Sequence, residues 1–190
     1  MGFKLIDIGI KKNNAEDVLM MLKIDLHIHT QKCKAGDGTK RVITPEIFIK
    51  KMNENEVCMC SSTNHNKFDL EEFNKIKSLD EELVIFPGIE LDVVSDSNQS
   101  HIVLVCDPVQ KDKFYKIFDN DTSRNYDEFT LSSEDFILKV KEFNPDEIII
   151  IPHFLDKDKK RSINFSFKNV LGTELSDYVI ILEPGKLATI

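Results

Sequence analysis

The sequence contains no apolar run long enough to cross a membrane. Its apolar stretches, such as residues 148–152, are a fraction of the roughly 20 residues that a bilayer-spanning helix needs. A secretory signal is also missing, because the apolar stretch at 3–10 is short, contains Lys4 and Asp7, and lacks a small-residue cleavage site. We therefore expect a cytoplasmic protein without membrane partners.

Cysteines are too few and too scattered for a disulfide framework. The chain has four, Cys33, Cys58, Cys60 and Cys106, and no two of them form a C-x-x-C pair. Cys58 and Cys60 lie two residues apart in a strand-like segment and share a face, where packing is a more frequent role than metal ligation. We expect all four to be reduced.

Positive charge is in the minority. The 190 residues include 25 Lys and Arg against 33 Asp and Glu, which gives a net charge of −8. This balance argues against a protein that binds nucleic acid through bulk phosphate neutralisation, although a basic segment or bound cations can reverse the sign locally. With 41% hydrophobic and 31% charged residues, the composition is that of one soluble globular domain.

Short β-branched strands alternate with amphipathic helices from residue 20 onward. Strands are expected at 23–29, 57–63, 83–87, 102–106, 147–151 and 178–182. N-cap patterns mark helix starts at Thr44-Pro45, Asp69-x-x-Glu72 and Ser132-x-x-Asp135. The alternation predicts an α/β fold built on a parallel sheet or barrel. Residues 1–19, polar in their middle, form a predicted N-terminal extension, and residues 20–190 form the domain.

The first of the predicted helices has a clear apolar side. Ile47, Phe48 and Met52 follow the Thr44-Pro45 start at helical spacing, and we expect all three to be buried. A further short helix is expected around Phe114–Phe118, before an acidic loop. These helices would cover the sheet, as in other α/β folds.

The histidines gather at the ends of the predicted strands. Four of the five lie at a carboxyl end: His27, His29, His65 and His153. Because side chains alternate across a strand, Asp25, His27 and His29 should project from one face, so that both imidazoles can reach one metal ion. The carboxyl edge of a parallel α/β sheet is where functional residues collect.

A carboxylate accompanies these histidines. Glu90 lies just past the third predicted strand and is the kind of ligand that can bridge two cations. His101 differs from the other histidines because it precedes its strand, and only ten residues separate it from Glu90. That is too short for a βαβ crossover, so we expect a hairpin-like or irregular return. The spacing leaves open whether His101 reaches Glu90.

Any one of these histidines alone is more often a structural or surface residue than a metal ligand. Their joint placement with a rim glutamate favours a site for more than one metal ion.

The sequence around these residues resembles the polymerase and histidinol phosphatase (PHP) domain family. Five segments carry the resemblance, in the order in which the family has them: 25–30 (DLHIHT), 63–66 (TNHN), 87–90 (PGIE), 100–105 (SHIVLV) and 151–154 (IPHF). The resemblance implies a distorted, TIM-like (β/α)7 barrel that hydrolyses phosphoesters with two or three divalent ions of zinc, manganese or iron.

The resemblance also implies roles for individual residues. His27 and His29 would hold a first ion with Glu90, which would bridge to a second ion. His101 and His153 would hold that second ion, and these five residues together would form the catalytic centre. His65 would serve a third ion.

Residues around this set receive supporting roles. Asn64 stands where the family has an aspartate, which removes a negative charge from the third site. Asp37 is a candidate for that third site, and Asp25 is a candidate for orienting the ligands. The loop after His29 carries four basic residues that could receive phosphate: Lys32, Lys34, Lys40 and Arg41. A solvated loop is the alternative interpretation.

The family ends its site with an Asp-x-His motif, and no histidine follows His153. We interpret this as a barrel incomplete at its C-terminal end, with weak or no activity in this chain; completion by another element and a degenerate domain are the alternatives. Residues 63–70 and Leu182-Glu183-Pro184 resemble PHP domains that precede a chromosome-segregation-type ATPase, which implies a fused or associated ATPase.

The preferred function is therefore a metal-dependent phosphoesterase, with nuclease activity as one form. A non-catalytic metal-binding module that regulates or supports an ATPase is the first alternative, and a zinc-stabilised interaction domain is the second. Nucleic acid, nucleotides and small phosphomonoesters all remain open as substrates, as does the oligomeric state.

Overall fold

The computed structural model of the protein describes residues 23–38, 42–95, 98–121, 123–152 and 172–179. The α-helices of these ranges are α1 (Pro45–Glu54), α2 (Leu70–Leu79), α3 (Lys111–Phe118) and α4 (Ser133–Val140). The strands are β1 (Lys23–Ile28), β2 (Val57–Ser62), β3 (Val84–Ser95), β4 (Asn98–Cys106), β5 (Leu131–Ser132) and β6 (Ile148–Pro152). Short 3-10 turns form at Pro108–Gln110 and Ser176–Tyr178. The predicted extension at 1–19 lies outside the described residues.

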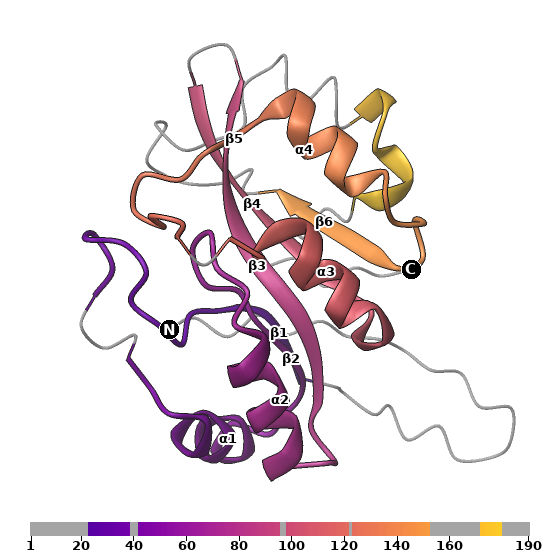
Figure 1. Cartoon of the computed structure of the whole chain (residues 1–190). Coiled ribbons are helices and arrows are strands. Elements are labelled where there is room, and N and C mark those ends of the chain that lie inside the picture. The colour runs from indigo at the N-terminus through magenta and orange to yellow at the C-terminus, as the bar shows by residue number, and fades with distance from the viewer. Residues whose placement is uncertain (1–22, 39–41, 96–97, 122, 153–171, 180–190) are drawn as a thin grey trace, which may run out of the picture.

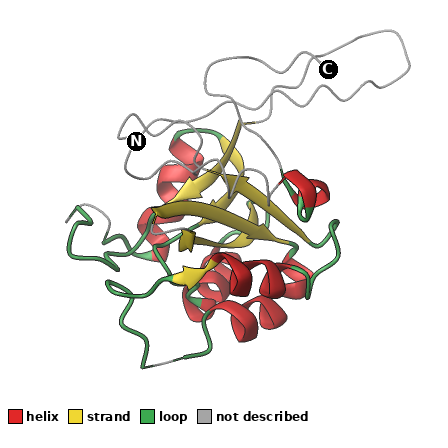
Figure 2. Ribbon diagram, turned by 90° about the horizontal axis from the view of Figure 1, so that it is seen from above, coloured by secondary structure: helices red, strands yellow, loops and turns green. Residues whose placement is uncertain are grey.

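The strands form one curled, mixed sheet with the order β1-β2-β3-β4-β6 (Figure 1). β1, β2 and β3 are parallel, whereas β4 is antiparallel to both of its neighbours, and β5 pairs with β3. The prediction of a parallel sheet or barrel is therefore wrong at β4, whereas the hairpin-like return expected between Glu90 and His101 is confirmed. Seen from above, the sheet bends into a half-barrel with helices packed along its outside (Figure 2).

β3 and β4 are longer than the sequence predicted. They span Val84–Ser95 and Asn98–Cys106, in place of 83–87 and 102–106. The apolar alternation continues past Gly88 through every second residue, but polar residues occupy the positions between, so the strand pattern was hard to recognise. As a result, Glu90 and His101 lie within strands and not beside them.

The helices begin where their N-cap residues predicted. Side chains of Thr44, Asp69 and Ser132 accept hydrogen bonds from backbone N–H groups three residues later. The expected burial of Ile47 is wrong, because that side chain is 44% exposed while Phe48 and Met52 are buried. No helix among the described residues is long and apolar enough to span a bilayer.

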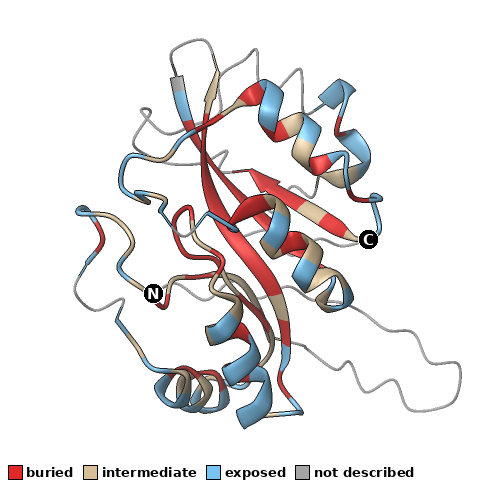
Figure 3. Ribbon diagram, viewed as in Figure 1, coloured by how far each residue is buried: buried red, intermediate tan, exposed pale blue. Residues whose placement is uncertain are grey.

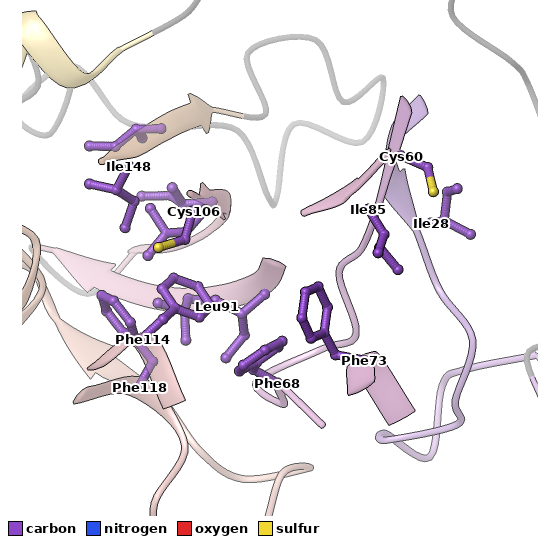
Figure 4. Packing of buried hydrophobic residues seen from close by; sticks show 14 of the residues in the cluster. Ile28, Cys60, Phe68, Phe73, Ile85, Leu91, Cys106, Phe114, Phe118 and Ile148 are labelled. Carbon is purple, nitrogen blue, oxygen red and sulfur yellow. The ribbon is translucent and has the colours of Figure 1, made fainter. Parts of the chain in front are cut away.

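The main hydrophobic core lies between the helices and the outer face of the sheet. Phenylalanines from all four helices fill it, and they include Phe48, Phe73, Phe114, Phe118 and Phe136. Figure 4 shows several of these rings gathered with Leu91 of β3, and the rings of Phe114 and Phe118 lie 5.0 Å apart. Each buried phenylalanine contributes about 1.5–3 kcal/mol, so this layer holds the sheet in its curl.

The inner face of the sheet carries a different set of side chains. Alternate residues of β3 and β4 enter the helix-covered core: Ile89, Leu91, Val93, Ile102 and Leu104. The residues between them belong to the opposite face, where Val103 and Val105 pack with Ile151 and with Leu26 of β1. Both faces of β3 and β4 are buried in the middle of the strands, at 87–93 and 100–106 (Figure 3). Glu90, Asp92 and His101 share this inner face by the same alternation.

Gly88 is needed because β3 passes very close to β2 and β4. A Cβ atom at Gly88 would lie 2.1 Å from Ser61 Oγ and 2.7 Å from Thr63 Cγ2. We predict that Gly88→Ala lowers the free energy of unfolding by about 1–3 kcal/mol, because it overpacks the strand and displaces the Ser61 hydroxyl from the Phe86 carbonyl.

Urea titration followed by circular dichroism measures this effect. Gly36→Ala is the matched control, because a Cβ there would meet nothing within 4 Å. Equal stability of the two variants would contradict the close approach of the strands at Gly88.

Candidate metal centre

One buried carboxylate, Glu90, lies in contact with four imidazoles. Its Oε2 atom is 3.3 Å from His27 Nε2, 3.1 Å from His29 Nε2 and 3.1 Å from His65 Nδ1. Its Oε1 atom is 3.0 Å from His101 Nδ1. The side chain of Glu90 is only 1% exposed. The structure thus gathers four of the five predicted histidines around the predicted bridging residue, and His153 lies outside the described residues.

A β-bulge in β1 directs the first two histidines. Asp25 pairs with Cys60 and Ile28 with Ser62, so β1 has one residue more than β2 between these pairs. The prediction that side chains alternate regularly between the two faces of the strand from Asp25 to His29 is therefore wrong. The imidazoles of His27 and His29 nevertheless both contact Glu90. The Asp25 carboxylate accepts a hydrogen bond from the His27 backbone N–H at 3.1 Å, which shapes this bulge.

A short hook after β2 delivers His65. The Glu90 N–H donates to the Asn64 carbonyl at 3.1 Å, and the Asn66 N–H donates to the Glu90 carbonyl at 2.7 Å. Asn66 has a φ of 55°, a left-handed conformation that asparagine tolerates better than most residues. The hook extends the β2–β3 pairing and places His65 directly beside Glu90.

Asn64 supports the loop that follows His29. Its Oδ1 atom accepts hydrogen bonds from the backbone N–H groups of Thr30 at 2.8 Å and Gln31 at 2.9 Å. Its Nδ2 donates to Thr30 Oγ1, which in turn donates to the Glu72 carboxylate at 2.8 Å. The N-cap pattern Asp69-x-x-Glu72 resembles a capping box, but it is only half formed: Asp69 accepts from the Glu72 N–H, while the Glu72 carboxylate accepts from Thr30. These contacts show that Asn64 supports the loop after His29.

Asp37 folds back onto the cluster from the same loop. Its Oδ1 atom is 3.3 Å from His65 Nε2, and its Oδ2 atom accepts the N–H groups of Cys33 and Lys34 at 2.9 and 3.0 Å. The two backbone bonds orient the carboxylate toward His65. The structure therefore brings together the two residues that the sequence linked to a third ion.

Asp92 is a member of the cluster that sequence reasoning missed. It lies opposite His101 in the β3–β4 register, and its Oδ1 atom is 2.9 Å from His101 Nε2. Asn66 Nδ2 donates to its Oδ2 atom at 3.0 Å. Asp92 follows Glu90 by two residues, and this spacing places the two side chains on the same face of a strand. This signal was overlooked because the strand was expected to end at residue 87.

The basic residues of the loop after His29 differ in position. Lys34 forms an ion pair with Asp92, and its side chain is 15% exposed. Lys32 is exposed, whereas Lys40 and Arg41 lie outside the described residues. Of the two described lysines of this loop, Lys34 is the one that enters the cluster.

Burial and charge set the protonation of the cluster. Burial would raise the pKa of Glu90, but hydrogen bonds from His101, His27 and His29 outweigh it and hold the pKa well below its usual range. Burial lowers the pKa of His65 to about 3, even though Glu90 and Asp37 oppose this shift. An anionic carboxylate beside a neutral imidazole is a donor pair suited to a metal cation.

The donor atoms fit divalent metal ions. Two groups of side chains bring their donors within 4.8 Å of one another: His27, His29 and Glu90, and His65, Glu90 and His101. Ligands at about 2.0–2.1 Å from a tetrahedral ion lie about 3.3 Å apart, close to the 3.0–3.3 Å observed around Glu90. Among the described residues, the Nδ1 atom of His65 is buried without a hydrogen bond and lies 3.1 Å from Glu90 Oε2, as expected of an atom aimed at a shared ion.

Three of the four thiols are unsuited to catalysis. Burial raises the pKa of Cys33 and of Cys106 to about 12, and it also raises the pKa of Cys60. All four cysteines are free, and Cys60 is part of the hydrophobic core. The chemistry of this site therefore depends on imidazoles and carboxylates.

Comparison with known proteins finds similarity in structure but not in sequence. No family model and no curated protein sequence matches the chain. A crystal structure from Bifidobacterium adolescentis, assigned as a metal-dependent phosphoesterase, matches 84% of this chain and 76% of its own, with TM-score 0.54 and 12% identity. An amidohydrolase from Chromobacterium violaceum, with bound sulfate and no metal, matches 83% of this chain and 75% of its own, with TM-score 0.51 and 12% identity. The chain shares their fold.

The low pKa of His65 predicts that the metal-free protein loses stability in mild acid. The unfolded chain takes up a proton on this imidazole near pH 6.5, whereas the folded protein does so only near pH 3, so stability falls as the pH drops below about 6.5. Between pH 7.5 and 5 this residue should cost on the order of 1–2 kcal/mol.

Urea unfolding of chelator-treated protein at both pH values tests this expectation. His65→Gln should lose less stability over this range than the wild type, because the group that titrates is gone. An identical loss in both proteins would show that His65 is not held neutral by burial.

Proposed function

We propose that this protein is a metal-dependent phosphoesterase of the PHP type. Two or more ions of zinc, manganese or iron would be held by His27, His29, His65, Glu90 and His101. The observation that carries the proposal is the Glu90 carboxylate, whose two oxygens contact imidazoles of both candidate ligand groups. A carboxylate in that position can bridge two ions, which is the arrangement that phosphoester hydrolysis uses.

The protein's own side chains prepare this site. Divalent ions, when bound, would polarise the phosphoryl group and acidify a water molecule. Glu90 stays anionic because its pKa is held low, and His65 offers a neutral ring. The Asp92 Oδ1 atom lies 2.9 Å from the Nε2 atom of His101, and this contact orients the imidazole ring of His101. The His27 side chain is 33% exposed, more than the others, so the substrate would approach from this side.

His153 remains a proposed ligand of the second ion. Its neighbour in sequence, Pro152, pairs with Ile102, the residue next to His101. Lys32, Lys40 and Arg41 remain proposed contacts for substrate phosphate. A phosphorylated small molecule fits the net charge of −8 better than a polynucleotide does, and salt-dependent binding of single-stranded nucleic acid would favour the latter.

A second candidate function is a metal-binding module without catalysis that supports an attached ATPase. It is favoured by the deep burial of Glu90, His65 and Asp92, which limits the access of a substrate to the cluster. Both candidates require bound metal. They differ in whether the loaded protein turns over a substrate.

The test combines metal analysis with an assay on a chromogenic phosphomonoester. Protein loaded with zinc or manganese should retain at least one ion per chain through desalting and should hydrolyse the substrate. Glu90→Gln should lose most of the metal and at least about a hundredfold of the activity, because it removes the shared anionic ligand. Glu56→Gln is the matched control, since Glu56 is exposed and pairs only with Lys23 among the contacts observed here.

Three results would separate the candidates. Metal bound without turnover of phosphomonoesters, nucleotides or single-stranded nucleic acid would favour the non-catalytic module. Turnover lost equally in Glu90→Gln and Glu56→Gln would contradict the role of Glu90. Failure of the wild type to retain any divalent ion would overturn the proposed metal centre itself.

A further inference from the structure

The segment 123–129 after α3 packs against the hook that carries His65. Arg124 anchors this segment, and its side chain is only 9% exposed. The Cζ atom of Arg124 lies 4.0 Å from the centre of the Phe129 ring, and its Nη1 atom is 3.3 Å from Asp119 Oδ1. Burying a charged group is costly, so an arginine this deep in a protein is usually held in place by its partners.

The guanidinium group joins the hook to the end of α3. Its Nη1 atom donates a hydrogen bond to the carbonyl of Asn66 at 3.2 Å and another to the carbonyl of Phe118, the last residue of α3. Arg124 and Asn66 are 58 residues apart in the chain. The hook therefore depends on a distant segment for part of its support.

Asn66 receives further contacts from the same segment. Its Nδ2 atom lies 3.0 Å from the carbonyls of Tyr126 and Phe129 and also 3.0 Å from Asp92 Oδ2. Its Oδ1 atom accepts a hydrogen bond from the Asp92 N–H at 2.9 Å. Asn66 is fully buried in a left-handed conformation, which costs free energy and persists only where the surrounding structure fixes it.

These contacts support the second candidate ligand group, which consists of His65, Glu90 and His101. His65 directly precedes Asn66, and the Asn66 N–H donates to the Glu90 carbonyl at 2.7 Å. Asp92, which Asn66 holds, orients the ring of His101. The first group differs, because His27 and His29 come from the bulged end of β1.

We propose that Arg124 is a positioning residue for the second ion, which His65, Glu90 and His101 would hold. This proposal rests on the metal centre proposed above. The guanidinium fixes the backbone of Asn66, and Asn66 fixes the directions of His65 and of the carboxylate that orients His101. Affinity for the second ion thus depends on the segment 123–129, although that segment supplies no ligand.

Calorimetric titration with zinc tests this role in Arg124→Met. The variant should bind the second equivalent about 10–100-fold more weakly than the wild type, because ligands that are no longer held in place bind metal less tightly. It should bind the first equivalent unchanged. Val140→Ala is the matched control, since it alters the hydrophobic core at α4 and should keep both affinities.

Nitrogen NMR of the imidazole rings gives a readout that a general loss of stability would not reproduce. In a zinc buffer that half-saturates the second site of the wild type, the ring nitrogens of His65 and His101 should shift. In Arg124→Met they should shift several-fold less in the same buffer. The ring nitrogens of His27 and His29 should shift equally in both proteins.

Asn66→Gly tests the same path without changing the arginine. Glycine adopts the left-handed conformation readily, so this substitution removes the side-chain contacts of Asn66 and leaves the backbone of the hook unstrained. The variant should also bind the second equivalent about 10–100-fold more weakly. It keeps the proposal testable even if Arg124→Met does not fold.

The outcomes separate this proposal from the metal centre on which it rests. An unchanged second affinity in either folded variant, or an equal loss of both affinities, would overturn the positioning role and leave the metal centre intact. A wild type that binds a single ion at His27 and His29 would also overturn it. The absence of any bound ion in the wild type would overturn both proposals.

Discussion

A buried glutamate is the constraint on which the rest of this structure depends. Glu90 lies on the inner face of a sheet whose two faces are both covered, and removing a carboxylate from water costs several kcal/mol unless partners compensate it. Four imidazoles surround it within 3.3 Å. A divalent cation bound between these imidazoles and the carboxylate, as proposed above, would stabilise the arrangement.

The departures from regular α/β geometry bring side chains of the cluster close to Glu90. The bulge in β1 turns His27 toward it, the hook after β2 places His65 beside it, and the β3–β4 hairpin sets Asp92 and His101 opposite each other. Gly88 lets β3 approach β2 closely enough for these contacts. The helices have a different role, since their phenylalanines stabilise the outer face and keep the sheet curled.

The sequence predicted the helix starts and the residues of the cluster better than it predicted the strands. N-caps such as Ser132 act locally, so their effect can be recognised without tertiary structure. The spacing between Glu90 and His101 indicated the hairpin before β4, but the length of β3 was missed because the polar residues of the inner face hide the strand pattern. Asp92 was missed for that reason. Lys34 was recognised as basic, but its pairing with Asp92 joins residues 58 apart in the chain.

The most direct test of a shared carboxylate between two ions is crystallography of the metal-loaded protein. Anomalous difference maps collected at the zinc or manganese edge should show two peaks about 3.5–4 Å apart, each within bonding distance of one Glu90 oxygen. One peak should also lie next to His27 and His29, and the other next to His101. Maps with no peak at Glu90, or with ions bound only at surface carboxylates, would contradict the account.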